Sequence, residues 1–304
     1  ISCSLVGSEM CIRDRYKHVP VIPFDSGTKL VVMSDCHRGQ GNAGDNFLAN
    51  QAVCFGALEY YFQKGFTYVE LGDGDELWEN RKLKTIVEVH DDIFWMMSRF
   101  YEEKRLYMVY GNHDIVKRNK SYMQRHCGCY YCDAAHQVQS LFPDISVREG
   151  LIFRNRKDGK EIFMVHGHQG DFLNDTLWPV SRFLVRYVWR YMELIGFLDP
   201  TGAGRPRKAK ERIEKRLADY GSSRKKILIA GHTHRPAFSK PGEGTYFNSG
   251  SCVHPRCITC IEIEDNRISL VKWSVRSGED RILRVEREVL EDPVSLTEYA
   301  AAEK

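Results

Sequence analysis

The sequence predicts an α/β fold built around a largely parallel β-sheet. Short apolar runs alternate with longer amphipathic stretches through the first third of the chain, an order typical of βαβ units. Several of the apolar runs stop abruptly at Asp, Asn or His. Because ligands of open α/β sheets bind beyond the carboxyl ends of the strands, these endings indicate a candidate site as well as a fold.

The first fifteen residues are set apart from the fold. Residues 4–15 resemble the in-frame translation of a sequencing adapter, and segments of this kind are excluded before a fold is argued. We therefore expect residues 1–15 to be non-native and loosely packed. The domain of interest is predicted to span residues 16–304.

The first half of that domain is predicted to hold three strands and two helices. The apolar runs have the length of buried strands, and the helices carry apolar residues at helical spacing. Asp45 is predicted to cap the first helix. In order, the elements are a strand at Lys29–Ser34, a helix at Asn46–Gln63, a strand at Thr67–Leu71, a long helix at Lys82–Lys104 and a strand at Leu106–Tyr110.

The second half is predicted to be richer in strands. Leu151–Arg154 and Glu161–Val165 form a hairpin around Asp158-Gly159, because Asp-Gly is a strong turn signal. Ile227–Ala230 is a further strand, and Thr245–Val275 is strand-rich with turns near Ser249 and Asp265. The charged tail after Ser277 has no predicted element.

A helical insertion is predicted over about residues 172–224. Leu177–Leu198 is aromatic-rich and helical in pattern, and Arg207–Tyr220 is a second, charged helix. Arg182, Arg186 and Arg190 recur every four residues and so share one helix face. This face is either a solvated surface or a lid that gathers anionic or lipid-bearing substrates at a membrane surface.

Composition limits the classes of function. The net charge of +3 is too small to favour nucleic acid as a partner. No apolar run approaches the roughly 20 residues of a membrane span, and no signal peptide is evident. We therefore expect a cytoplasmic protein, in peripheral contact with a membrane if the insertion acts as a lid.

Five predicted strands end in residues that bind metals. Carboxylate, imidazole and one amide, without thiolate, suit borderline-hard ions such as Mn²⁺, Fe²⁺ or Zn²⁺. Seven side chains are too many for one such ion and fit two ions about 3.5–4 Å apart, which can clamp a phosphoryl group. The candidate ligands are Asp35, His37, Asp73, Asn112, His166, His232 and His234.

These residues resemble, in order, the five motifs of the calcineurin-like metallophosphoesterase superfamily. The motifs are Asp35-x-His37, Gly72-Asp73, Gly111-Asn112-His113-Asp114, His166-Gly167-His168 and Gly231-His232-x-His234. The resemblance spans Val31–Ser251 and includes the Asn248-Ser249-Gly250-Ser251 turn. It implies a four-layer αββα sandwich and hydrolysis of a phosphodiester, pyrophosphate or phosphomonoester by metal-bound hydroxide.

The resemblance also implies a role for each residue. Asp35, His37 and His234 would hold one divalent ion, Asn112, His166 and His232 a second, and Asp73 would bridge them. Manganese is the preferred candidate, with iron and zinc as alternatives. His113 would bind the phosphate and protonate the leaving oxygen, and Asp114 would orient His113, in line with general acid–base chemistry.

Finer details of the motifs indicate which class of substrate to expect. Gly72-Asp73-x-x-Glu76-x-Trp78 and the run from Gly231 to Pro236 resemble UDP-diacylglucosamine pyrophosphohydrolases, which cleave a nucleotide–lipid pyrophosphate. Those enzymes carry Arg where this chain has His113. Two alternatives stay open: a nuclease or cyclic-nucleotide phosphodiesterase, and a non-catalytic metal-binding scaffold.

Further residues are assigned supporting roles. Glu76, His168 and the three insertion arginines are candidate substrate contacts. Gly74 is predicted to allow a sharp turn, and Trp78 to pack under the insertion. Cys129-x-x-Cys132 and Cys257-x-x-Cys260 have zinc-knuckle spacing, but their separation along the chain favours buried, reduced thiols.

Overall fold

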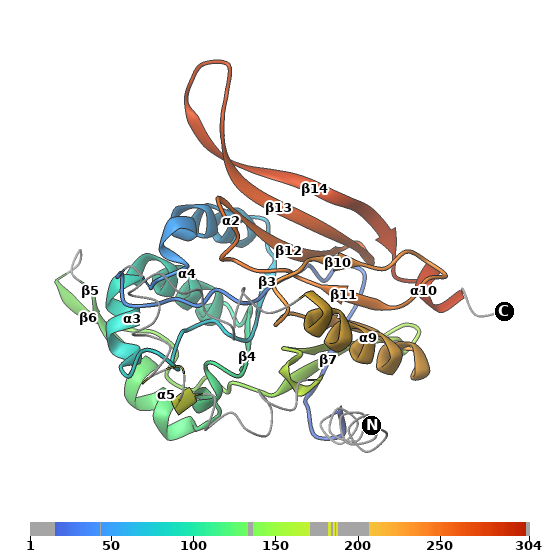
Figure 1. The fold of residues 1–304 in the computed structure, drawn as a ribbon, viewed down its shortest axis with the longest axis horizontal. Coiled ribbons are helices and arrows are strands. Elements are labelled where there is room, and N and C mark those ends of the chain that lie inside the picture. The colour runs from blue at the N-terminus through green and yellow to red at the C-terminus, as the bar shows by residue number, and fades with distance from the viewer. Residues whose placement is uncertain are drawn as a thin grey trace.

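The fold has two β-sheets stacked face to face between outer layers of helix (Figure 1). The computed structural model describes residues 16–42, 44–132, 136–170, 182, 183, 185, 187 and 207–301. Within these ranges each of the two large sheets has six strands, and a third sheet has two. The four-layer αββα sandwich expected from the motifs is therefore confirmed.

The first large sheet carries the N-terminal ligand loops. Its order is β14-β13-β12-β2-β3-β4, with β2, β3 and β4 parallel and the remaining pairs antiparallel. Because these three neighbouring strands are parallel, their carboxyl ends lie at the same end of the sheet. The strands are β2 (Leu30–Met33), β3 (Thr67–Leu71), β4 (Leu106–Val109), β12 (Cys257–Glu264), β13 (Arg267–Ser277) and β14 (Leu283–Ser295).

The second large sheet carries the C-terminal ligand loops. Its order is β1-β7-β8-β9-β11-β10, and β8 runs parallel to β9. The hairpin predicted from Asp158-Gly159 is present as antiparallel β7 and β8. The strands are β1 (Val21–Phe24), β7 (Gly150–Asn155), β8 (Glu161–Val165), β9 (Ile227–Ala230), β10 (Ala237–Phe238) and β11 (Tyr246–Asn248).

Helices cover the outer face of each sheet, and the small third sheet lies beside them. Along β2, Leu30 and Val32 face the second sheet, whereas Val31 and Met33 face the helices. Strands buried on both faces read as continuous apolar runs, which is why they were recognisable in the sequence. The remaining elements are η1 (Leu48–Asn50), α2 (Gln51–Gln63), α3 (Leu83–Val89), α4 (Asp91–Glu102), η2 (Ile115–Arg118), α5 (Lys120–Cys127), β5 (Cys129–Cys132), β6 (Gln137–Ser140), η3 (His168–Gly170), α9 (Arg207–Ser223) and α10 (Glu298–Ala301).

Two predictions about the first helices are wrong for one reason. The long helix expected at Lys82–Lys104 is broken at His90, whose φ and ψ are −113° and 38°. The buried His90 ring contacts Asp45 Oδ2 at 2.9 Å and Gln51 Oε1 at 2.8 Å. Asp45 is thereby held in the preceding loop, where it accepts a hydrogen bond from Gly41, and it does not cap α2.

The charged tail that had no predicted element contains a long strand. β14 pairs with β13 from Ser277↔Leu283 to Arg267↔Ser295. Figure 1 shows the far end of this hairpin extending beyond the rest of the chain. The turn predicted near Asp265 is present, with Asp265 and Asn266 both at positive φ, as a type I′ hairpin requires.

The predicted insertion is described only in part. α9 confirms the helix expected from Arg207, but Ile213 and Leu217 pack against β8 and β9, so α9 is the outer layer of the second sheet. Residues 1–15, with their expected loose packing, and most of residues 172–206 lie outside the described residues. No helix in the described part of the chain is long and apolar enough to cross a membrane.

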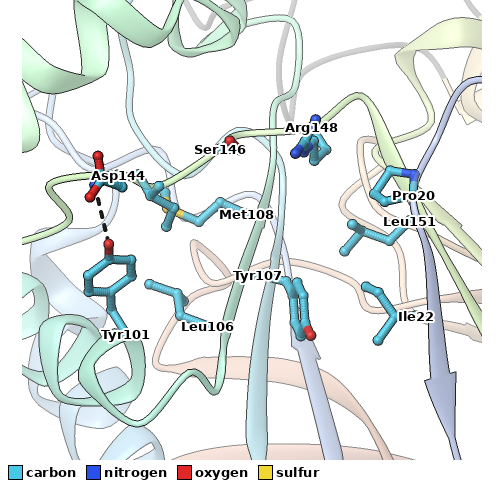
Figure 2. A pocket seen from close by; sticks show the side chains of 11 residues that line it. Pro20, Ile22, Tyr101, Leu106, Tyr107, Met108, Asp144, Ser146, Arg148 and Leu151 are labelled. Carbon is cyan, nitrogen blue, oxygen red and sulfur yellow. Dashed lines mark hydrogen bonds between the residues drawn. The ribbon is translucent and has the colours of Figure 1, made fainter.

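An open cleft of about 270 Å³ lies where the edges of the two sheets meet (Figure 2). Its lining comes from α4, from β1 and the residue before it, from β4, and from β7 and the segment before it. Arg148 in that segment pairs with β4 through backbone hydrogen bonds to Met108 and Tyr110. The cleft contains no candidate ligand, so it is separate from the site described next.

Candidate metal centre

The candidate ligands converge at the facing carboxyl ends of the two sheets. β2, β3 and β4 deliver Asp35, His37, Asp73 and Asn112, whereas β8 and β9 deliver the remaining histidines. Two compact trios of these candidate ligands result. They are Asp35, His37 and His234, and Asp73, His166 and His232, with the ligand atoms of each trio within 4.8 Å of one another. A third group within the same distance joins His37 to Glu76 and His113.

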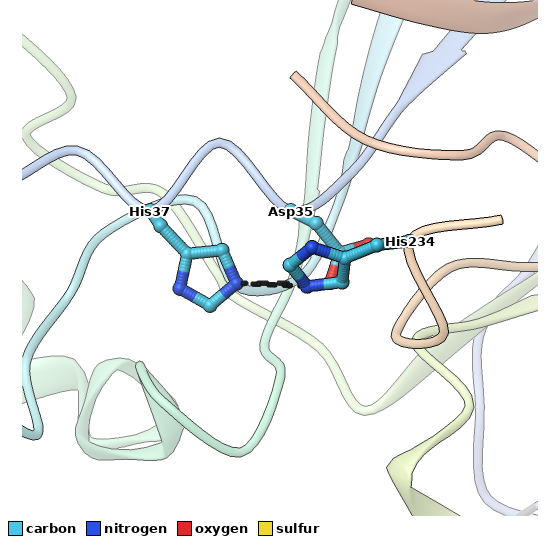
Figure 3. Close-up of side chains that lie close together, drawn as sticks. All are labelled: Asp35, His37 and His234. Carbon is cyan, nitrogen blue, oxygen red and sulfur yellow. Dashed lines mark hydrogen bonds and ion pairs between the residues drawn. The ribbon is translucent and has the colours of Figure 1, made fainter. Parts of the chain in front are cut away.

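The first trio has the spacing of ligands around one ion (Figure 3). Asp35 Oδ1 lies 3.2 Å from His234 Nε2 and 3.9 Å from His37 Nε2. The two imidazole Nε2 atoms are 3.3 Å apart. Ligands about 2.1 Å from a single ion stand about 3–3.5 Å from each other, so small shifts would complete this set.

Asp73 occupies the position between the two trios. Its Oδ2 atom lies 3.0 Å from His166 Nε2 in the second trio and 3.8 Å from His37 Nε2 in the first. Its Oδ1 atom accepts a hydrogen bond from the His113 backbone N–H at 2.8 Å. The carboxylate is therefore held where a bridging ligand would stand.

Buried polar atoms without partners support a metal at this place. Asn112 is fully buried, and within the described residues neither its Oδ1 nor its Nδ2 has a hydrogen-bond partner. Asp35 Oδ1 and His166 Nε2 are also buried, and their close contacts are with other candidate ligands, His234 Nε2 and Asp73 Oδ2. Burying polar atoms in this way costs free energy unless something compensates. Two divalent ions could take Asn112 Oδ1, Asp35 Oδ1 and the unprotonated His166 Nε2 as ligands, so the residues fit them.

Hydrogen bonds to the other ring nitrogens orient two of the histidines. His166 Nδ1 lies 2.9 Å from the Leu71 carbonyl oxygen, and His37 Nδ1 lies 2.9 Å from Glu76 Oε2. A ring that donates from Nδ1 keeps the Nε2 lone pair for a metal, and such partners also raise ligand basicity. Both rings are therefore arranged as Nε2 ligands.

The backbone at the ligands is strained. Asp35, His37, Asp73, His232 and His234 all have φ between 47° and 67°. In the described part of the chain only twelve non-glycine residues have positive φ, and these five are among them. Such conformations cost about 1–3 kcal/mol each and cluster at functional sites. The fold therefore opposes local preference here in order to aim these side chains.

In the metal-free centre, the carboxylates and the imidazole rings shift one another's pKa values. Burial lowers the pKa values of His37 and His166. Glu76 and the ligand carboxylates outweigh burial at His37, and Asp73 and Asp35 outweigh it at His166, so that both pKa values are raised to about 9. Burial raises the pKa values of Asp35 and Asp73, but the surrounding histidines outweigh it and hold both below the usual range. Without metal, imidazolium rings neutralise the carboxylates.

These pKa shifts predict how the stability of the metal-free protein depends on pH. The pKa values of His37 and His166 are higher in the folded protein than in the unfolded chain. Their contribution to folding stability is therefore complete below about pH 6.5 and is lost as pH rises through about 9. We expect the melting temperature in chelator to be several degrees lower at about pH 9.5 than at pH 6.5. Mn²⁺ should raise it more at the higher pH, since metals bind neutral imidazole. An equal or higher melting temperature in chelator at the higher pH would contradict this assignment.

His113 lies beside the first trio and is held by Glu76. Its Nδ1 atom is 2.7 Å from Glu76 Oε2, the same oxygen that contacts His37. The Trp78 ring stacks on the other side, with centroids 4.1 Å apart and planes 19° apart. Burial lowers the pKa of His113, but Glu76 and Asp73 outweigh it and raise the pKa.

The partner predicted for His113 was wrong. Asp114 instead accepts hydrogen bonds from the backbone N–H groups of Gly111 and Gly74, and its Oδ2 lies 2.8 Å from Lys117 Nζ. Asp114 therefore supports the loops, and Glu76 orients the imidazole. Trp78, expected to pack under the insertion, is the stacking partner of that imidazole.

The structure gives a reason for glycine at position 74 that differs from the predicted one. Positive φ values occur at Gly72 and Asp73, not at Gly74. A Cβ at Gly74 would lie 2.3 Å from Glu70 Oε1 and 2.7 Å from Arg38 Nη2. Glycine is required at this position because buried side chains approach the backbone closely.

The remaining predicted contacts have mixed outcomes. His168 is buried, with its ring centroid 5.5 Å from that of His166, so it borders the second trio. Arg182 is half-buried, and Arg186 and Arg190 lie outside the described residues.

No candidate metal cluster within the described residues contains a cysteine, and the described Cys257 and Cys260 are free thiols.

Two buried cations at the site were missed by sequence reasoning. Arg38 and Lys117 are at most 1% exposed and form ion pairs with Asp75. Each lies close in sequence to a motif, because Arg38 follows His37 and Lys117 follows Asp114 by three residues. In the sequence, the signal that could have identified these two buried cations was a basic residue close to a motif that contains acidic residues.

The chain belongs to the calcineurin-like phosphoesterase superfamily. The profile described as "Calcineurin-like phosphoesterase superfamily domain" matches residues 29–265, well over half of the chain. The match includes all seven candidate ligands and His113. A search of curated proteins finds no match.

The chain is similar in fold to crystal structures of Vps29. A single mutant of Vps29 from Entamoeba histolytica has 13% sequence identity and a TM-score of 0.39, with 87% of this chain and 100% of that chain covered. Vps29 from Chaetomium thermophilum has 10% identity and a TM-score of 0.39, with 88% and 97% covered. Likeness at this level supports no conclusion about this chain.

Proposed function

We propose that the protein hydrolyses a phosphoester or pyrophosphate with the help of two divalent ions, manganese being the first candidate. One observation carries the proposal. Imidazole nitrogens and carboxylate oxygens from four strand ends converge within a few ångströms. At the fifth strand end lies buried Asn112, whose side chain has no hydrogen-bond partner among the described residues. A fold that needed only stability would have little reason to bury these polar groups together.

The protein's own residues supply the rest of the chemistry. Bound divalent ions would activate water and offset the charge of a phosphoryl group. Asp35, His37 and His234 would hold one ion and Asn112, His166 and His232 the other, with Asp73 shared. His113 would give a proton to the leaving oxygen, because Glu76 keeps its ring protonated and fixed while Trp78 limits its rotation.

Within this chemistry we propose a nucleotide–lipid pyrophosphate, of the UDP-diacylglucosamine kind, as the first substrate to test. The run from Gly72 to Trp78 and the run from Gly231 to Pro236 support it. Contact of the protein with a membrane surface would follow from such a substrate. A nuclease or cyclic-nucleotide phosphodiesterase is the competing assignment, because His113 replaces the arginine of the lipid enzymes.

A substrate panel tests the proposal. Mn²⁺-loaded protein would be assayed on UDP-diacylglucosamine, a cyclic nucleotide, single-stranded DNA and RNA, bis-p-nitrophenyl phosphate and p-nitrophenyl phosphate, with a chelated sample as control. We expect Mn²⁺-dependent turnover of at least one diester or pyrophosphate. Two bound metals with no turnover of any member would refute hydrolysis and leave a metal-binding scaffold.

A further inference from the structure

Five charged side chains form a buried cluster beside the candidate metal centre. We call them the buried charge cluster. Each is at most 1% exposed, and burial of so many charges is costly unless all of them are paired. The members are Arg38, Glu70, Asp75, Asp114 and Lys117.

The cluster is held together by short ion pairs centred on Asp75. Arg38 Nε lies 2.6 Å from Asp75 Oδ1, and Lys117 Nζ lies 2.6 Å from Asp75 Oδ2. Arg38 Nη2 also contacts Glu70 Oε2 at 2.8 Å, and Lys117 Nζ contacts Asp114 Oδ2 at 2.8 Å. Each oxygen of Asp75 therefore serves a different cation.

These ion pairs join three separate ligand loops. Arg38 directly follows His37, Asp75 comes two residues after Asp73, and Asp114 comes two residues after Asn112. The backbone follows the same connections, since Arg38 N–H donates to the Gly74 carbonyl and Gly74 N–H donates to Asp114. A displacement of any member would therefore move a ligand.

We propose that the buried charge cluster is a positioning unit that fixes the three loops relative to one another and so sets the affinity of the centre for divalent ions. The inference rests on the metal centre of the proposed function. The close approach of Glu70 and Arg38 to Gly74, which leaves no room for a Cβ, shows that the loop packs directly on the cluster. A purely stabilising ion pair would not need to connect ligand loops, and apolar residues could replace it.

The test is a double variant that removes one charge of each sign. Asp75→Asn with Lys117→Met leaves the net charge of the cluster unchanged but breaks the link between the loops. We expect calorimetry, without substrate, to show Mn²⁺ binding about 10–100-fold weaker than in the parent protein. Circular dichroism and melting would confirm that the variant is folded.

A matched control lies in the same sheet, away from the loops. Glu262 on β12 is 4% exposed and accepts hydrogen bonds from Arg287 and Tyr61. Glu262→Gln weakens a partly buried ion pair away from the ligand loops, so it should lower the melting temperature and leave Mn²⁺ affinity unchanged.

The outcomes separate the two proposals. Parent-like Mn²⁺ affinity in the folded double variant overturns the positioning role. If the double variant does not fold, Lys117→Arg, which keeps the charge and changes its shape, takes its place with the same expectation and the same overturning result. Because the measurement needs no substrate, a failure of hydrolysis would leave it unaffected.

Discussion

Asp73→Asn is expected to lower Mn²⁺-dependent hydrolysis of bis-p-nitrophenyl phosphate at least about a thousandfold while leaving the protein folded. Asp73 reaches both trios, with Oδ2 3.0 Å from His166 Nε2 and 3.8 Å from His37 Nε2. An amide loses the negative charge and one of the two oxygens that a bridge requires. Activity and metal content, measured on the same sample, should fall together.

The same substitution at an exposed aspartate provides the control. Asp158 lies in the turn between β7 and β8, where its carboxylate accepts a hydrogen bond from Lys160. Asp158→Asn should leave turnover and metal content unchanged. Full activity in Asp73→Asn would show that Asp73 is not a shared ligand.

His113→Ala is expected to lower turnover about 10²–10⁴-fold on a substrate with a poor leaving group, such as an alkyl phosphodiester. A p-nitrophenolate leaving group needs little protonation, so its loss should be much smaller. Metal content should not change, because His113 is held by Glu76 and Trp78 outside both trios. The comparison of the two substrates is the measurement.

His18→Ala serves as the control for removal of an imidazole, because His18 is exposed and far in sequence from every motif. It should behave as the parent protein with both substrates. Equal losses on the two leaving groups in His113→Ala would indicate that His113 binds phosphate without donating a proton.

The strands and their endings were predictable because they carry a local pattern. β2, β8 and β9 are buried on both faces, so each reads largely as a continuous apolar run, and β3 reads as an apolar run interrupted by Glu70. The ligands follow immediately at the carboxyl ends, where the topology gathers them. The Asp-Gly turn of the β7–β8 hairpin was equally local.

The errors involve pairs of residues that are distant in sequence. Nothing local shows that His90 turns inward to contact Asp45, 45 residues away, and so divides a long helix. In the same way, Glu76 takes the place expected for Asp114 beside His113 because two loops meet.

β14 was missed for a different reason, because its charged, half-exposed residues lack the apolar run of a buried strand.

The sequence by itself determined the fold class, the strand ends and the set of ligand types, because these depend on short-range patterns of apolar and polar residues. Only the tertiary structure decided which carboxylate orients His113. It also revealed that Arg38 and Lys117 are buried among three ligand loops. These features depend on distances between side chains that the chain brings together only when the two sheets stack.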